Sequence, residues 1–130
     1  MISVTLATAR DFRAYYKHPM PEVCTALVGR ENGRILGIGG CMWDDEGRAW
    51  GFLDHGYTPD DPPPALTLHR QARRFLAAMR QVGEPAIYTA VEAHRSHRAE
   101  AWLRRLGFEI STEFPTADKV VWKWQSQERK

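Results

Sequence analysis

The chain has 130 residues and a formal net charge of +2, from 18 basic and 16 acidic side chains. Its length fits one ordinary domain, and its 43% hydrophobic and 26% charged residues indicate a soluble globular protein, not a disordered or fibrous one. The sequence has no long apolar run, so we expect no membrane span. Its N-terminus has no basic segment followed by an apolar stretch, so we expect no secretory signal. The balanced charge gives no reason to expect nucleic-acid binding. Cys24 and Cys41 form no disulfide framework, which predicts reduced thiols and a cytoplasmic location.

The first half of the chain predicts a strand, a helix and a three-stranded meander. Residues 1–6 alternate in hydrophobicity as a strand does. Thr8 followed by Asp11 is a helix-start pattern, because the threonine hydroxyl can accept a free first-turn amide. Asn32-Gly33 is a strong hairpin signal, since both residues tolerate a positive φ. The predicted strands of the meander are residues 23–29, 34–43 and 48–55.

The second half follows a proline-rich segment, YTPDDPPP at 57–64, which predicts a stiff loop within one domain. Hydrophobic periodicity predicts a helix over 66–82, and a short apolar run predicts a buried strand over 86–92. Ser96 can cap a second helix that ends at Leu106. The remaining predictions are a hairpin of 107–113 with 119–125, a single domain of 1–125 and a frayed tail of 126–130.

The resulting order, β-α-β-β-β-α-β-α-β-β, resembles the GNAT superfamily of acyl-CoA-dependent N-acetyltransferases. The segment AEAWLRRLGFEI strengthens the resemblance, because Ala99, Gly107 and Phe108 match a helix-Gly-Phe pattern of that family. Leu103 departs from it, standing where a tyrosine commonly acts as general acid. The resemblance implies an α/β fold with a mixed, mostly antiparallel sheet and helices on both faces.

In the resembled family, two central strands part and acyl-CoA enters the gap, so we expect the strands 48–55 and 86–92 to diverge. The family holds the pyrophosphate on a glycine-rich turn at a helix N-terminus. This chain has no glycine between Gly56 and Gly83, and three consecutive prolines supply no amide donors there. Side chains could make the acetyl-CoA contacts instead, namely Thr67, His69 and Arg70, together with Leu53 and Ser96. The alternative is that tight acetyl-CoA binding is lost.

The end of the strand 48–55 carries the candidate catalytic residues Asp54, His55 and Tyr57. An amine must lose its proton before it can attack a carbonyl, so a base is needed. Asp54 or His55 could supply it, directly or through a water, and Tyr57 could protonate the departing thiolate. The acceptor would be a small-molecule or peptide amine, and Tyr15, Tyr16 and His18 could line its pocket. The plainer interpretation is that Asp54-His55 only turns the strand into a loop.

A second hypothesis is a catalytically inactive GNAT-like structural or interaction protein of bacterial phage or prophage origin. The glycine-free segment favours it, whereas Asp54, His55 and Tyr57 favour the enzyme, so the sequence leaves activity open.

The predictions also include a homodimer. No third metal ligand accompanies His94 and His97, so we expect no metal site there. We expect these histidines to lie in a solvated basic loop.

Overall fold

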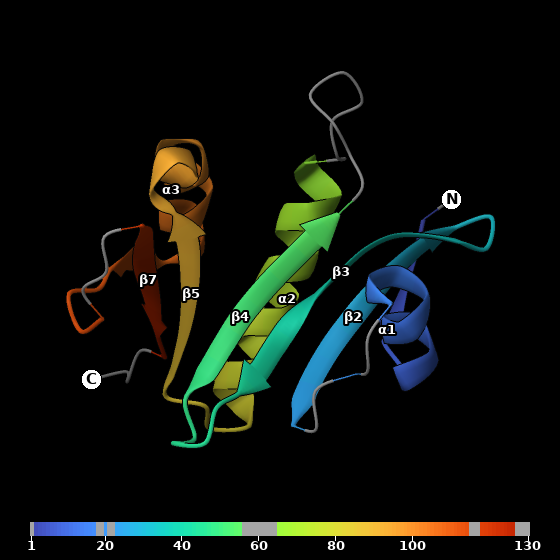
Figure 1. Ribbon diagram of the computed structural model, residues 1–130, viewed down its shortest axis with the longest axis horizontal. Coiled ribbons are helices and arrows are strands. Elements are labelled where there is room, and N and C mark those ends of the chain that lie inside the picture. Colours follow the sequence, from blue (N-terminus) through green and yellow to red (C-terminus); the bar gives the residue numbers. More distant parts are fainter. Residues whose placement is uncertain (1, 18–19, 21–22, 56–64, 115–117, 127–130) are drawn as a thin grey trace. The chain divides into compact units, whose positions relative to one another are not determined.

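The structure is a computed structural model, and its described residues are 2–17, 20, 23–55, 65–114 and 118–126. At 55, 65 and 95–98 only the backbone is described. The chain folds into an N-terminal unit, Met1–Pro63, and a C-terminal unit, Pro64–Lys130 (Figure 1).

The N-terminal unit is an antiparallel sheet with one helix. Its strands follow one another in the order β1-β2-β3-β4, so each strand pairs with the next along the chain. Asn32 and Gly33 take positive φ values of 54° and 80° in the turn between β2 and β3, as the hairpin prediction requires. The elements are β1 (Ser3–Leu6), α1 (Ala9–Tyr16), β2 (Cys24–Glu31), β3 (Arg34–Trp43) and β4 (Ala49–His55).

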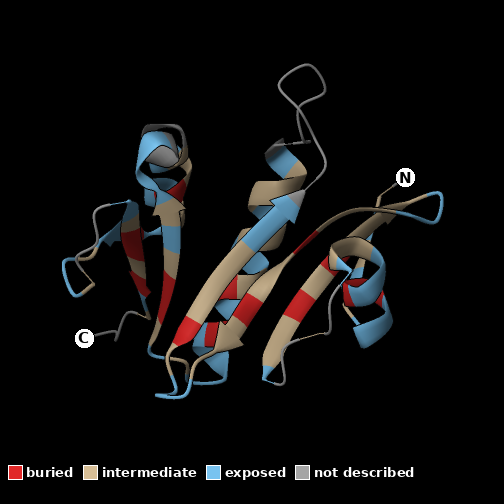
Figure 2. Cartoon of the chain, viewed as in Figure 1, coloured by how far each residue is buried: buried red, intermediate tan, exposed pale blue. Residues whose placement is uncertain are grey.

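Helix α1 begins with the predicted cap and packs on the sheet. The Thr8 side chain accepts a hydrogen bond from the Asp11 backbone amide, and the Asp11 side chain accepts one from the Thr8 amide. Phe12 is buried against three sheet residues, which form the core of this unit, shown in red in Figure 2. These residues are Ala26, Val28 and Ile38. The helix thus covers one face of the sheet.

The glycines of β3 allow a close approach between strands. A Cβ atom at Gly40 would lie 2.2 Å from the Thr25 carbonyl oxygen on β2. The register between β2 and β3 also shifts at one point: Gly29 faces Gly37, while Arg30 faces Ile35. This irregularity is a β-bulge of the kind expected where glycine interrupts a strand.

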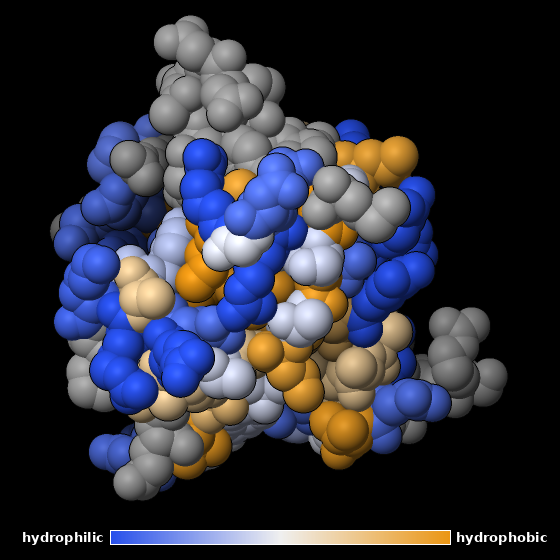
Figure 3. All heavy atoms as spheres, turned by 90° about the vertical axis from the view of Figure 1, so that its right-hand side faces the viewer, coloured by the Kyte–Doolittle hydropathy of each residue, from blue (hydrophilic) through white to orange (hydrophobic). Residues whose placement is uncertain are grey.

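Some hydrophobic side chains of the N-terminal unit stay outside this core. Leu6 is 67% exposed and Val23 is 56% exposed. Figure 3 turns the side that carries α1 toward the viewer, and hydrophobic side chains (orange) reach its surface among hydrophilic ones (blue). Single exposed apolar residues are common on protein surfaces and do not by themselves mark a site.

The C-terminal unit places β7 between β5 and β6, with both pairings antiparallel. Trp122 and Trp124 of β7 share one face and are buried. The first strand of the predicted 107–113 hairpin is shorter than expected, because only Phe108–Ile110 pairs with β7. The elements are α2 (Ala65–Gln81), β5 (Ala86–Glu92), a 3-10 turn (Ala93–Arg95), α3 (Ser96–Leu106), β6 (Phe108–Ile110) and β7 (Lys119–Gln125).

The predicted order of elements and the mixed α/β class are confirmed. Of the described helices, none is both long and apolar enough to span a bilayer. The predicted loop at 57–64 lies outside the described residues. The single domain of 1–125 and the divergence of strands 48–55 and 86–92 stay predictions.

Candidate functional site

The candidate site of the N-terminal unit lies at the end of β4, where Asp54 is exposed. Side chains alternate between the two faces of a strand, so Phe52 and Asp54 share a face, while Leu53 belongs to the other. Phe52 packs against the core beneath α1. The register places Asp54 opposite Ile38, which belongs to that core. Asp54 therefore stands beside the helix-covered face of the sheet.

Tyr16, in the last turn of α1, contacts this carboxylate. Its hydroxyl donates a hydrogen bond to an Asp54 oxygen over 2.5 Å, a short distance for this type of bond. Tyr15 stands next to it, with ring centroids 5.1 Å apart and planes at 89°. On its other side Tyr16 lies 5.3 Å from the ring of Phe12. The rings thus form a continuous group from the core to the carboxylate.

Burial and the neighbouring Asp54 carboxylate raise the pKa of both Tyr15 and Tyr16. Burial, and then the hydrogen bond to Asp54, raises the pKa of Tyr16 far above its ordinary value. Burial also raises the pKa of Tyr15, and the negative charge of Asp54 adds to this shift. A phenol with a raised pKa keeps its proton at neutral pH, so Tyr16 remains a hydrogen-bond donor to Asp54.

Cys24 of β2 packs against the same buried cluster as Tyr16. The thiol is half-buried, and this burial raises the pKa of Cys24. A thiol with a raised pKa is a poor nucleophile at neutral pH, because the thiolate is the reactive form.

An ion pair fixes α1 to the sheet. Arg30 of β2 binds the Asp11 carboxylate and also donates to the Thr5 hydroxyl of β1 over 3.2 Å. Burial opposes ionisation of Asp11, but hydrogen bonds from Thr8 and Arg30 outweigh it, so the pKa of Asp11 lies below its ordinary value. Asp11 is thus a buried, charged anchor for the helix that carries Tyr15 and Tyr16.

The predicted acetyl-CoA residues of the C-terminal unit lie in the first turns of α2. Thr67 and His69 are half-buried and Arg70 is exposed. The Nδ1 atom of His69 is buried and has no hydrogen-bond partner among the described residues. Such an orphaned polar atom is expected to bind a water or a ligand. Hydroxyl, imidazole and guanidinium groups are together suited to phosphate oxygens.

The other predicted residues are only partly described. Leu53 is 40% exposed on β4. Ser96 is the first residue of α3, and like His55 it is described only by its backbone. Tyr57 and His18 lie outside the described residues. The structure thus joins Asp54 to Tyr16, a bond that the sequence did not predict, although two tyrosines in one helical turn were a visible signal.

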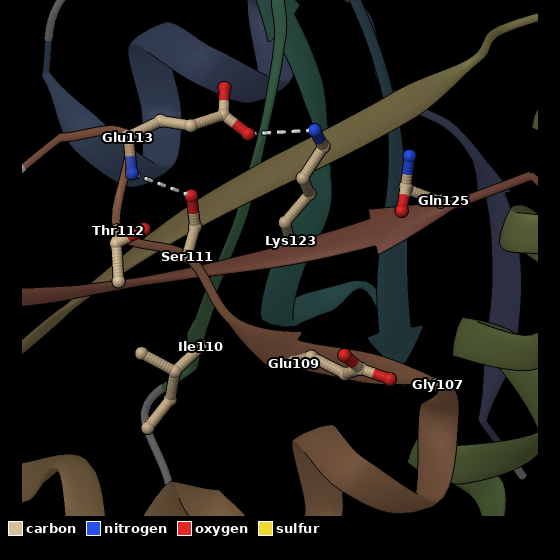
Figure 4. Close-up of a pocket in the computed structure, with 8 residues that line it drawn as sticks. All are labelled: Gly107, Glu109, Ile110, Ser111, Thr112, Glu113, Lys123 and Gln125. Atoms are coloured by element: carbon tan, nitrogen blue, oxygen red, sulfur yellow. Dashed lines mark hydrogen bonds and ion pairs between the residues drawn. The ribbon is translucent and has the colours of Figure 1, made fainter.

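A polar hollow of about 260 Å³ lies on β6 and β7 of the C-terminal unit. Figure 4 shows the Glu113 carboxylate reaching Lys123, at a distance of 2.8 Å, above the Ser111 hydroxyl. Glu113 also accepts a hydrogen bond from the Tyr88 hydroxyl at 3.0 Å. The charge of Lys123 is therefore met by Glu113, and none of the residues predicted for the active site lines this hollow.

Comparisons with known proteins concern the fold. No family model matches the sequence, and no curated protein matches it. Among solved structures, the chain is similar to the ribosomal-protein-S18-alanine N-acetyltransferase of Escherichia coli, with a TM-score of 0.75, 16% identity and coverage of 100% of this chain and 97% of that one.

Two further solved structures agree. The spermidine/spermine N-acetyltransferase of Vibrio cholerae matches with a TM-score of 0.66 and 12% identity, over 97% of this chain and 95% of its own. A structure from Salmonella typhimurium, solved with its cofactor acetyl-CoA, matches with a TM-score of 0.66 and 14% identity. The match covers 98% of this chain and 95% of that one. The chain therefore has the fold of the GNAT N-acetyltransferases.

Proposed function

We propose that this chain is an acyl-CoA-dependent N-acyltransferase that moves an acetyl or related acyl group to a primary amine. The observation that carries the proposal is the exposed Asp54 carboxylate, held by Tyr16 at the end of β4 in a chain with the GNAT fold. Neighbours named for spermidine and spermine and for a ribosomal-protein alanine support a small-molecule or peptide amine as acceptor.

In the proposed reaction the amine nitrogen attacks the thioester carbonyl directly. The C–N bond forms, the C–S bond breaks, and the sulfur leaves with the electron pair of that bond. Asp54 or His55 helps to remove the proton of the attacking amine, directly or through a water. Tyr57 returns a proton to the sulfur. The raised pKa of Cys24 supports this direct route, because burial keeps that thiol protonated and makes it a poor carrier of the acyl group.

The proposed acyl-CoA contacts replace the missing glycine-rich turn by side chains. Thr67, His69 and Arg70 bind the pyrophosphate, and the exposure of the Arg70 guanidinium in the first turns of α2 supports this assignment. Leu53 and Ser96 are the other two residues that contact acyl-CoA in this proposal. The neighbour that contains acetyl-CoA supports acetyl-CoA as co-substrate.

A thermal-shift titration with acetyl-CoA and with CoA tests binding. A ligand at 100 times its Kd stabilises a protein by about 2.7 kcal/mol, so we expect Tm to rise by several degrees at submillimolar acetyl-CoA. Arg70→Gln should reduce this shift, whereas Arg104→Gln, on α3, should leave it unchanged. An unchanged Tm at several millimolar acetyl-CoA would contradict the proposal and favour the non-catalytic hypothesis.

Release of free CoA thiol in the presence of a panel of primary amines tests the chemistry. Asp54→Asn should lower kcat by about 100-fold or more, since this is the usual contribution of a general base. Glu113→Gln is the matched control, because its carboxylate also binds a tyrosine hydroxyl but lies on the other unit. Equal losses in both variants would argue against a catalytic role for Asp54.

A cytoplasmic location, a homodimer and a phage origin stay predictions.

A further inference from the structure

Charge is divided unevenly between the two units. The N-terminal unit has six basic and nine acidic residues, whereas the C-terminal unit has twelve basic and seven acidic ones. The balanced charge of the whole chain, which gave no reason to expect nucleic-acid binding, therefore combines an acidic half with a basic half. A basic surface attracts polyanions, so the position of the excess basic residues indicates where one could bind.

Much of the excess lies on α2. This helix of 17 residues carries four arginines and no acidic residue. Arg70, Arg73 and Arg74 have the i, i+3 and i+4 spacing that places side chains on one side of a helix, and all three are exposed. Arg80 is also exposed, about 15 Å further along the axis than Arg70. The solvent side of α2 is therefore basic along much of its length.

Helix α3 extends this basic surface. The guanidinium carbon of Arg80 on α2 lies 5.2 Å from the ring centroid of Trp124, and that of Arg104 on α3 lies 5.2 Å from the ring centroid of Trp122. Because the two tryptophans share one face of β7, both helices cover that face. Arg105 of α3 is exposed as well, so it adds to the basic surface on this side of the C-terminal unit.

Three of these arginines have no acidic partner within the described ranges. Arg73, Arg74 and Arg105 form no ion pair there, in contrast to Arg104, which binds the Glu100 carboxylate at 2.9 Å. Their guanidinium groups therefore keep their donors for a ligand. The planar guanidinium fork can donate two parallel hydrogen bonds to the oxygens of one phosphate group.

The surroundings of these arginines favour a nucleic-acid duplex over other polyanions. A membrane-binding helix inserts a stripe of large apolar side chains beside its basic ones, whereas the exposed Leu66 and Val82 stand at the two ends of α2 and form no stripe along it. Single strands bind largely by stacking their bases on aromatic side chains, but Trp122 and Trp124 are buried here. A duplex backbone requires only a basic surface that contacts its phosphates.

We propose that the solvent side of α2 and α3, centred on Arg73, Arg74 and Arg105, binds the phosphate backbone of a nucleic-acid duplex without reading its sequence. This surface contains none of the residues proposed for acyl transfer or for acyl-CoA binding. Binding there requires neither an acyl donor nor the proposed acyl-transfer activity.

Fluorescence anisotropy of a short labelled DNA duplex, with the full-length protein and no CoA compound, tests this surface. Neutralisation of about three phosphates should give a slope of about −2.7 for log K against log salt, since each contact contributes about −0.9. The affinity should therefore fall about 40-fold between about 50 and 200 mM NaCl. Absence of binding at the lower salt concentration, or an affinity that does not change with salt, would overturn the inference.

Variants assign the binding to these residues. Arg73→Gln, Arg74→Gln and Arg105→Gln should each reduce the size of the slope by about 0.9, because each removes one phosphate contact. Arg73→Lys should keep the slope, because the charge remains. Arg10→Gln is the matched control, since it removes an exposed arginine of α1 in the other unit and should leave affinity and slope unchanged. Equal effects of Arg10→Gln and Arg73→Gln would overturn the proposed surface.

Competition decides the kind of partner. An unlabelled duplex, a single strand of the same length, poly-glutamate and vesicles that contain phosphatidylserine each compete with the labelled duplex. We expect the unlabelled duplex to compete at least about tenfold more strongly than any of the others, because it presents the densest array of phosphates. Equal or stronger competition by one of the others would assign the surface to that partner and overturn the duplex.

Discussion

Arg30 on β2 forms an ion pair with Asp11 on α1, and the same carboxylate completes the cap at the start of that helix. Asp11 is only 5% exposed, so the pair lies at the contact between helix and sheet. Since the helix ends in Tyr15 and Tyr16, this anchor sets where Tyr16 meets Asp54. The candidate site therefore depends on a charge that takes no part in the proposed chemistry.

We expect Asp11→Asn to lower the free energy of unfolding by about 2 kcal/mol at pH 7, because it removes a buried, charge-assisted contact. Urea unfolding followed by circular dichroism measures this. The exposed Asp45→Asn is the control and should change stability by less than about 0.5 kcal/mol. Equal stability of the two variants would show that the pair does not anchor the helix.

Protonation of the Asp11 carboxylate should lower the free energy of unfolding in acid. The pKa of Asp11 is lowered in the folded chain, and in the unfolded chain it is about 3.9. Its stabilisation is therefore complete above about pH 4 and is lost as the pH falls through the folded pKa. Between pH 5 and 2 the unfolding free energy of Asp11→Asn should fall less than that of the unmodified chain. Parallel curves would contradict a lowered pKa.

Tyr16 should resist ionisation in alkaline solution. Its pKa is raised in the folded chain, while an unfolded tyrosine ionises at about pH 10. The stabilisation is thus complete below about pH 10 and is lost as the pH rises toward the folded pKa. The absorbance difference at 295 nm between the unmodified chain and Tyr16→Phe should stay near zero up to the onset of unfolding. A phenolate signal with a midpoint near pH 10 would disprove the bond to Asp54.

Gly40→Ala should destabilise the N-terminal unit by about 3 kcal/mol, because the added methyl group meets the backbone of β2. Gly29→Ala is the matched control: the nearest atom to its new Cβ is a side-chain carbon of Ile2 at 4.0 Å. We expect that variant to change stability by less than about 0.5 kcal/mol. Thermal unfolding of both variants tests the close approach, which an equal Tm would rule out.

Cys24→Ala should keep the proposed acyl-transfer activity within about threefold, because a thiol with a raised pKa is a poor acyl acceptor. Intact-protein mass spectrometry after mixing with acetyl-CoA should show no acetyl group on Cys24. A stable acetyl-cysteine whose loss in Cys24→Ala abolishes turnover would replace direct attack by a covalent route.

Much of the fold could be read from short stretches of sequence. Thr8 and Asp11 cap a helix, and Asn32-Gly33 makes a turn, because these effects involve residues within a few positions of each other. A short apolar run located β5 with its observed bounds, Ala86–Glu92. The strand predicted over 107–113 is longer than the observed β6, because pairing with β7 decides where β6 ends.

Local sequence signals were enough to predict the order of elements and to single out Asp54, because caps, turns and periodicity act over a few residues. The tertiary structure alone decided that Tyr16 donates its hydrogen bond to a carboxylate 38 positions away. That contact depends on the register of β2, β3 and β4 and on the angle at which α1 packs over them. Register and packing arise from many weak contacts between distant segments, and no short pattern of residues encodes their sum.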